Sequence, residues 1–284
     1  MATLAPAPLP SSPDAPRLPA LPRHGLRRSL ALAKVFRLEQ SDPDTFYRSV
    51  AEDTVAQIGQ YTTLVGTTVI DVGGGAGYFT EALRGAGARC TLVEPEAGEA
   101  PLSPPGPGSP PADRHRYAVS AGRVAVGVTV AGDGYHLPVP DGLADLTFSS
   151  NVLEHVPDVS SFLDELVRVT RPDGLVYVSF TAWYSFWGGH ETAPWHYLGG
   201  HRAARRYETK TGHPPKNRFG SSLFACHVGP TLRLVRRRPD VDVIAAIPRY
   251  HPRWLHWVVA VPVLRELVTW NLLLVLRRRP EATA

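Results

Sequence analysis

The chain has 284 residues, 43% of them hydrophobic, and a formal net charge of +4. This length supports one α/β core with insertions and does not require two independent domains. The two cysteines, Cys90 and Cys226, fit neither a disulfide framework nor a Cys-x-x-Cys metal site, so both are expected to be buried free thiols in a reducing cytoplasm.

Residues 1–24 are rich in proline and alanine, and we expect them to form a disordered tail. From 25 to 64 the apolar residues follow helical spacing in two segments. Asp42 before Pro43 is typical of a helix start, with the aspartate as N-cap and the proline at the first helical position. These helices are expected either to help close a ligand pocket or to cover the sheet edge.

A glycine-rich loop follows a buried strand that begins at Val69. Four glycines stand there within five residues: Gly73, Gly74, Gly75 and Gly77. Glycine lets backbone N–H groups and a helix N-terminus approach a ligand closely, and four of them would be a needless entropic cost in an empty turn. The spacing Asp71-x-Gly73-x-Gly75-x-Gly77 differs from the dinucleotide fingerprint, which needs glycine where Tyr78 stands. We therefore predict a ligand-binding loop and disfavour a nicotinamide cofactor.

A second strand is predicted from Arg89 to Val93, and it closes with Glu94. A carboxylate at this point can accept hydrogen bonds from both hydroxyls of a ribose, whereas its structural alternative is a helix cap. Residues 97–112 are a Pro-, Gly- and Ser-rich loop insertion. A third strand leads to Asp133 and Gly134, where the carboxylate can accept a hydrogen bond from an adenine amine.

The pattern then predicts a fourth strand over 144–150, a helix over 162–170, a turn over 171–174 and a fifth strand over 175–180. Asn151 follows the fourth strand, at the sheet edge where open α/β folds bind ligands. Further on, a sixth strand is predicted over 241–247.

Residues 254–276 are apolar enough to suggest a membrane span, but charged residues stand in the middle of the segment. Charges at that depth are costly, so we expect a buried helix over 254–268 and a buried strand over 271–276. Contact with a membrane surface is the alternative.

Five motifs in order resemble the class I S-adenosylmethionine-dependent methyltransferases, in particular those acting on small molecules and lipids. They lie between Val69 and Phe180 and comprise Asp71-Val-Gly-Gly-Gly-Ala-Gly77, Val93-Glu94-Pro95, Gly132-Asp133 through Pro138, Ser149-Ser-Asn-Val-Leu-Glu-His-Val156 and Arg168-Val-Thr-Arg-Pro-Asp-Gly174. More narrowly, the chain is similar to uncharacterised mycobacterial and other actinobacterial methyltransferases. Phe46-Tyr47-Arg48, Gly188-Gly-His-Glu191 and Pro248-Arg-Tyr-His-Pro-Arg-Trp254 are among the shared segments.

The resemblance implies a Rossmann-like α/β fold and S-adenosylmethionine as cofactor. The sheet would have seven mostly parallel strands, with an antiparallel last strand between the fifth and sixth, helices on both faces and an insert after the fifth strand. The loop glycines would then surround the methionine part of the cofactor, Glu94 would hold the ribose, Asp133 and the backbone of Gly134 would meet adenine, and Asn151 would lie beside the sulfonium. Asp173 departs from the family's usual glycine, at a turn remote from the cofactor.

Residues 181–227 are too long for an ordinary connection and combine aromatic residues with histidines and glycines. We expect an acceptor-side insert, with a packing-only role as the alternative. The candidates for a general base are His155, His190, Glu191 and His196. No metal site is predicted, because His190, Glu191 and His196 lack the H-E-x-x-H spacing.

Basic residues far outnumber acids between His201 and Arg238, which favours an anionic partner. A small-molecule, lipid or glycan acceptor carrying phosphate fits this charge, as does a peripheral contact with a membrane surface. The alternative without a partner is a basic face that is simply exposed to solvent. Nucleic acid is disfavoured. The predicted activity is methyl transfer, most readily to oxygen. A catalytically silent S-adenosylmethionine-binding regulatory or partner protein is the competing hypothesis, and the sequence carries no indication of an oligomeric state.

Overall fold

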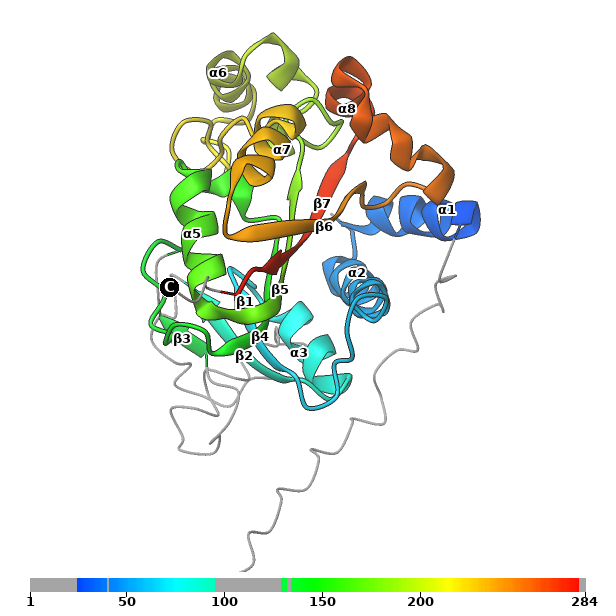
Figure 1. The fold of residues 1–284 in the computed structure, drawn as a ribbon. Coiled ribbons are helices and arrows are strands. Elements are labelled where there is room, and N and C mark those ends of the chain that lie inside the picture. The colour runs from blue at the N-terminus through cyan, green and yellow to red at the C-terminus, as the bar shows by residue number, and fades with distance from the viewer. Residues whose placement is uncertain (1–24, 40, 95–128, 132–133, 281–284) are drawn as a thin grey trace, which may run out of the picture.

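The computed structural model describes residues 25–39, 41–94, 129–131 and 134–280 (Figure 1). The expected tail at 1–24, the loop insertion at 97–112 and the predicted adenine contact Asp133 lie outside these residues.

Seven strands form one sheet in the order β3-β2-β1-β4-β5-β7-β6. Their bounds are β1 Thr68–Val72, β2 Arg89–Glu94, β3 Thr129–Ala131, β4 Ala144–Ser150, β5 Thr170–Thr181, β6 Val241–Pro248 and β7 Asn271–Arg278. The first five strands pair in parallel, whereas β7 runs antiparallel to both β5 and β6. The expected α/β fold, with a mostly parallel sheet and an antiparallel strand between the fifth and sixth, is confirmed.

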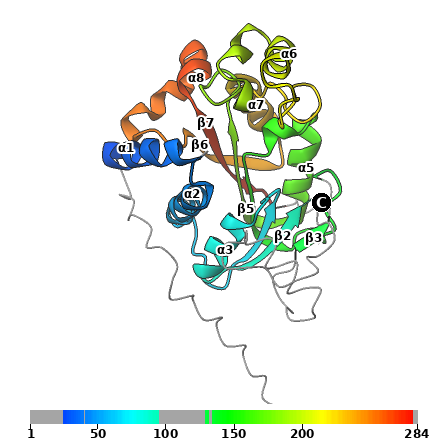
Figure 2. The same ribbon diagram turned by 180° about the vertical axis from the view of Figure 1, so that it is seen from behind.

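Helices cover both faces of this sheet (Figures 1 and 2). The α-helices are α1 Gly25–Val35, α2 Pro43–Ile58, α3 Tyr78–Gly85, α5 Val159–Val169, α6 Gly200–Thr211, α7 Val228–Arg237 and α8 Pro262–Val268. The 3-10 helices are η1 Phe36–Leu38, η2 Leu153–His155, η3 His190–Thr192, η4 Trp195–Leu198 and η5 Arg253–Ala260. Side chains of α5 and α7 pack in one hydrophobic core, and those of α2 and α3 in a second core on the opposite face.

The two cores follow from the alternation of side chains along each strand. In β1, Val69 belongs to the α2–α3 core and Ile70 to the α5–α7 core, because successive strand residues point to opposite faces. Both are 1% exposed or less, as expected for a parallel strand that is covered on both faces.

Two aspartates set the starts of the longer helices. Asp42 accepts a hydrogen bond from the Thr45 N–H at 3.2 Å, and Pro43 occupies the first position of α2, as predicted. Asp158 caps α5 in the same way, which places the start of that helix at Val159 rather than at the predicted residue 162.

The predicted turn at 171–174 lies inside β5 rather than before it. Ala144 pairs with Thr170 and Leu146 pairs with Leu175, so the residues between these pairs bulge out of the ladder. Asp173 has a φ of 61°, which lets the strand resume its register at Leu175.

The predicted buried helix over 254–268 is wrong. The segment forms η5, breaks at Val261 and restarts as α8 with Pro262 at its first position. Proline cannot continue a preceding helix because it lacks an N–H and clashes with the earlier turn. Trp254 and Trp257 are 65% and 55% exposed, whereas Val258 and Val259 are buried, so η5 is only partly buried. Within the described residues no helix has the length and apolar character needed to cross a bilayer.

Cys90 and Cys226 are buried free thiols, as expected.

Candidate functional site

The loop between β1 and α3 adopts a conformation that only glycine takes readily. Gly73, Gly75 and Gly77 have φ values of 75°, 52° and 80°, all in the left-handed region. Gly77 is the N-cap of α3, so the helix N-terminus opens directly from the loop. A Cβ on Gly75 would meet no atom of the described residues within 4 Å, whereas a Cβ on Gly73 would lie 2.6 Å from Val152 Cγ2.

Asp71 lies beneath this loop and is completely buried. Its Oδ2 accepts a hydrogen bond from the Thr80 hydroxyl at 2.5 Å. Its Oδ1 is also buried but has no partner among the described residues. Burial raises the pKa of Asp71 to about 7, because the carboxylate loses its hydration. One oxygen of the site is therefore left ready to accept a hydrogen bond.

Glu94, at the end of β2, is tied to the glycine loop. Its Oε2 accepts a hydrogen bond from the Gly75 N–H at 2.8 Å, and the Val93 carbonyl accepts one from the Gly73 N–H at 2.8 Å. These bonds hold the loop against the carboxyl end of β2. Glu94, which is predicted to bind the ribose, therefore lies next to the glycine loop. The sequence spacing did not indicate its hydrogen bond with Gly75.

Gly134 follows the third strand, and it lies against α5. A Cβ there would stand 2.6 Å from Phe162 Cε2, so glycine is required for this close approach.

Asn151, directly after β4, has a φ of 59°. Its N–H donates to the Ser179 carbonyl at 2.8 Å, and its Oδ1 accepts a hydrogen bond from Asn271 Nδ2 at 2.7 Å. Because the neighbouring Val152 contacts the space beside Gly73, the end of β4 meets the glycine loop. The carboxyl ends of β1, β2 and β4 therefore contribute to one site.

His155 and His190, two of the predicted catalytic residues, are brought together with their ring centroids 5.2 Å apart. His155 Nδ1 lies 2.6 Å from the Ser222 carbonyl oxygen. A carbonyl only accepts hydrogen bonds, so Nδ1 carries the hydrogen and Nε2 keeps its lone pair. Burial lowers the pKa of His190 to about 4, and its ring is neutral at physiological pH.

Glu191 and His196, the other two candidates, have different surroundings. Glu191 Oε1 accepts a hydrogen bond from Asn217 Nδ2 at 2.9 Å, and burial together with Glu191 raises the pKa of Glu39. His196 is fully buried in the insert, where its Nε2 is 3.2 Å from the Ser185 carbonyl oxygen. Of the four candidates, the structure thus pairs only His155 with His190.

Glu154 is a residue of the site that the sequence reasoning missed. It is 2% exposed, its Oε1 accepts a hydrogen bond from the Thr181 N–H at 3.0 Å, and burial raises its pKa. The sequence feature that points to Glu154 is its position directly before His155, shortly after a predicted strand.

Arg249 was missed as well, although it is fully buried next to the ends of β4 and β5. It donates to the hydroxyls of Ser150 and Ser179 at 2.8 and 2.6 Å, and to Thr54 of α2 at 2.6 Å. Arg28 of α1 pairs with Asp53 and donates to the Arg249 carbonyl at 3.1 Å. The Arg249 guanidinium carbon also lies 5.6 Å from the ring centroid of Tyr177 in β5.

The N-terminal helices also contact the insert through aromatic rings. Phe36 has its ring centroid 5.4 Å from that of Trp187 and 4.8 Å from that of Tyr250. These helices therefore contact the insert and the segment after β6, which goes beyond covering a sheet edge.

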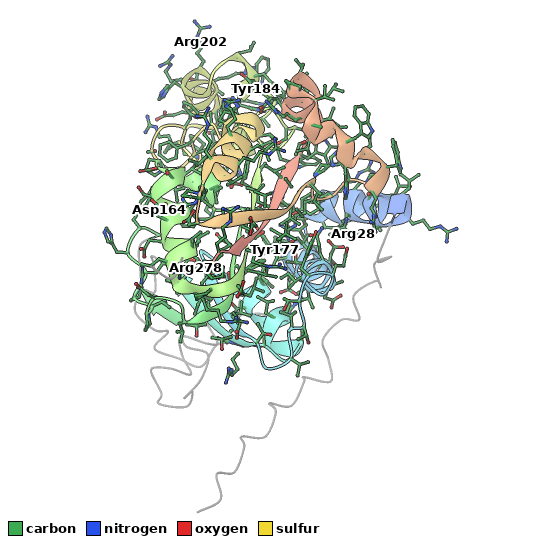
Figure 3. All side chains as sticks on the ribbon, in the orientation of Figure 1. Arg28, Asp164, Tyr177, Tyr184, Arg202 and Arg278 are labelled. Atoms are coloured by element: carbon green, nitrogen blue, oxygen red, sulfur yellow. The ribbon has the colours of Figure 1, made fainter. Side chains whose placement is uncertain are left out.

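The basic residues divide into paired and unpaired sets. Arg238 binds Asp164 and Asp240, whereas no carboxylate of the described residues pairs with Arg202 or Arg205 on α6. Arg202 projects away from the body of the molecule (Figure 3). Arg206 stacks over Trp195, with its guanidinium carbon 3.9 Å from the ring centroid.

Comparison with known proteins gives a consistent set of relatives. The model of a family described as a methyltransferase domain matches residues 70–178. An uncharacterized methyltransferase of Mycobacteroides abscessus is 44% identical over 263 residues, covering 90% of this chain and 96% of that protein. An uncharacterized methyltransferase of Mycobacterium tuberculosis is 45% identical over 260 residues, covering 89% and 96%. The crystal structure of an S-adenosylmethionine-dependent methyltransferase from Mesorhizobium loti shares the fold, with a TM-score of 0.51 and 20% identity over 80% of this chain and 98% of that one.

Proposed function

Since the chain belongs to the S-adenosylmethionine-dependent methyltransferases, we propose that it methylates a hydroxyl oxygen of a small-molecule, lipid or glycan acceptor. The observation that carries the choice of oxygen is the oriented His155 ring, whose Nε2 keeps a lone pair for a proton. A hydroxyl acceptor must lose a proton during methylation, and a neutral imidazole can take it.

The residues around the glycine loop fit the cofactor. Among the residues that the structure describes, Asp71 Oδ1 is a buried acceptor without a partner, and no atom stands within 4 Å of a Cβ placed on Gly75. A carboxylate stands at the end of β2, where Glu94 can accept hydrogen bonds from ribose hydroxyls. Asp71, the loop glycines Gly73, Gly74, Gly75 and Gly77, together with Glu94, Gly134 and Asn151, would hold the cofactor; the same role for Asp133 stays a prediction.

When bound, S-adenosylmethionine supplies an electrophilic methyl group on a sulfonium that is already a good leaving group. The chain's own residues must therefore align the acceptor, exclude water and accept a proton. His155 Nε2 takes the hydroxyl proton as the oxygen becomes the nucleophile. The half-buried His190 ring beside it limits the space in which the acceptor oxygen can stand.

The insert and the N-terminal helices form the acceptor side. Tyr184, Phe186 and Tyr197 of the insert are exposed at 39%, 61% and 45%, which is unusual for large aromatic side chains. Arg202 and Arg205 lie on the same insert and favour an acceptor that carries a negative charge. Aromatic and cationic side chains together suit a phosphorylated lipid or glycan.

Methyl transfer is tested with tritiated S-adenosylmethionine and a cell extract separated into lipid, glycan and small-molecule fractions. We expect labelling in one fraction and, by mass spectrometry, the methyl group on oxygen. His155→Ala should lower the rate ~10²–10⁴-fold through loss of the base, whereas the exposed His213→Ala control should not. Label on nitrogen or carbon, or full activity of His155→Ala, would refute the assignment.

Cofactor binding is tested separately by calorimetry with S-adenosylmethionine alone. Glu94→Ala should weaken binding by ~1–3 kcal/mol, because charged hydrogen bonds to the ribose are lost. Glu52→Ala, at an exposed glutamate of α2, is the matched control and should bind normally. Unchanged affinity in the Glu94 variant would show that the ribose is held elsewhere.

A further inference from the structure

Glu154, His155 and His190 form a cluster in which one donor atom of each side chain lies within 4.8 Å of the other two donor atoms. η2 supplies the first two residues directly after β4, and η3 supplies His190 from the insert. A carboxylate and two imidazoles are thus brought together from separate segments of the chain.

Two polar atoms of these side chains are buried and have no hydrogen-bond partner among the described residues. Glu154 Oε2 and His190 Nε2 make no hydrogen bond to any residue in the described part of the chain. A buried polar atom left unpaired costs about 1–3 kcal/mol. In addition, His190 has a φ of 46°, a left-handed conformation that is uncommon for residues other than glycine. Strained backbone conformations of this kind cluster at active sites and ligand clamps.

Backbone groups orient the rest of the cluster. The His155 Nδ1–H donates to the Ser222 carbonyl at 2.6 Å, and Glu154 Oε1 accepts from the Thr181 N–H at 3.0 Å. Metal-binding histidines usually donate their other ring N–H to a carbonyl or carboxylate, and metal-binding carboxylates are themselves hydrogen-bonded. A hydrogen-bonded proton relay would instead pair Glu154 Oε2 or His190 Nε2, and neither atom is paired within the described residues.

We propose that Glu154, His155 and His190 bind one divalent transition-metal ion of the zinc type. Two imidazoles and one carboxylate are ligands that zinc and its neighbours accept, and three protein ligands leave a coordination position open. Bonds of about 2.0–2.2 Å to the ion require ligand atoms roughly 3–4 Å apart. The ligand atoms of the cluster lie within 4.8 Å of one another, so ion binding requires them to draw together by about 1 Å.

The ion site itself does not depend on the proposed function. Only the role of the open coordination position rests on that proposal. There the ion binds the acceptor hydroxyl and lowers its pKa, so that the O–H bond breaks and the proton passes to solvent. The oxygen keeps the bonding pair and is the nucleophile for the methyl group. When the ion is bound, His155 is one of its ligands, and the ion replaces the His155 base of the proposed function as the group that promotes loss of the hydroxyl proton; the acceptor remains a hydroxyl oxygen.

Metal binding is tested on the full chain with zinc alone. The chelator-treated protein is dialysed against buffered Zn²⁺, and bound zinc is measured by mass spectrometry of the metal. We expect one equivalent in the wild type and at least ~100-fold weaker binding in His190→Ala and Glu154→Gln, since loss of even an outer-shell partner costs 10–100-fold. His213→Ala, which removes an exposed histidine, should bind like the wild type.

Cobalt substitution gives a second readout that needs no variant. Wild-type protein with Co²⁺ should show the visible absorption bands of a four- or five-coordinate site. Added Zn²⁺ should displace the Co²⁺ ion, so that these bands disappear. Absence of both bound zinc and these bands, or equal zinc binding by wild type and His190→Ala, would overturn the proposal.

Calorimetry with S-adenosylmethionine and methyl-transfer assays separate this inference from the proposed function. A chelator should abolish methyl transfer while cofactor binding persists, and zinc should restore the transfer. Zinc bound without any methylation of a hydroxyl acceptor would contradict the proposed function but leave the metal site standing. Full methyl transfer in the zinc-free protein would contradict the catalytic role of the ion while the proposed function stands.

Discussion

Asp71 is a residue whose chemistry departs far from its ordinary behaviour. It is fully buried, only one of its oxygens is hydrogen-bonded within the described residues, and its pKa is raised to about 7. The buried carboxylate accepts from Thr80 at the start of α3, so it also links β1 to that helix. A buried negative charge at this position lowers the stability of the fold unless a hydrogen-bond donor of a ligand pairs with the second oxygen.

The raised pKa of Asp71 predicts a specific pH dependence of stability. Between pH 4 and 7 the folded protein keeps a proton on Asp71 that the unfolded chain has released. The free energy of unfolding therefore falls as pH rises through this window, by up to ~4 kcal/mol from this group. Asp71→Asn should remove that decrease. Urea unfolding of both proteins at several pH values, without cofactor, measures the difference, and parallel pH profiles would contradict the raised pKa.

Element by element, the sequence predicted what depends on local pattern. The glycine loop, the strand ends at Glu94 and Ser150, and the Asp42 cap each follow from spacing within a few residues, and the structure has them at those positions. The break at Val261 follows from the local sequence as well, because Pro262 cannot continue the helix that precedes it.

Contacts between distant segments could not be predicted in this way. The pairing of Glu154 with His190 depends on how the insert folds back over the end of β4, and no local spacing encodes that path. The same holds for Arg249, whose partners come from α2, β4 and β5. Glu154 and His190 are far apart in the sequence and match no closely spaced metal-ligand motif, so the candidate ion site becomes visible only in the folded chain.

Two glycines in similar conformations allow the loop element to be tested. Gly75 and Gly66 have φ values of 52° and 76°, and a Cβ at either would meet no atom within 4 Å in the part of the chain that the structure describes. Alanine at each should cost a similar ~1–2 kcal/mol of unfolding free energy, from the left-handed backbone alone. Only Gly75→Ala should also weaken S-adenosylmethionine binding, because its methyl group enters the space that the loop faces. Calorimetry on both variants, with equal affinities as the contradicting result, decides this.

At the scale of the whole molecule, the N-terminal helices, the insert and the segment after β6 meet around the end of the sheet that carries the site (Figure 1). Arg28 and Arg249 join α1 to that segment, while Phe36, Trp187 and Tyr250 form the aromatic contact between all three parts. The glycine loop follows β1 of the sheet, whereas the proposed acceptor side is built from chain outside the matched residues 70–178.

Arg249 provides the test of this shared architecture. Its guanidinium is fully buried and donates to three hydroxyls on different elements. Arg249→Met should lower the unfolding free energy by ~2–4 kcal/mol, because several buried hydroxyls lose their donor. The exposed Arg237→Met on α7 should change it by less than ~0.5 kcal/mol. Equal urea midpoints for the two variants would show that the buried network does not hold the parts together.

The hydrogen bond between Asn151 and Asn271 has a consequence for how the protein is made. A ribosome delivers every residue of the glycine loop long before it delivers β7, whose first residue donates to Asn151 at 2.7 Å. A nascent chain that stops at residue 178 carries the whole matched segment, yet it lacks the partner that holds Asn151 and leaves β5 without its neighbour. Cofactor binding should therefore appear late in translation, when β7 is inserted between β5 and β6.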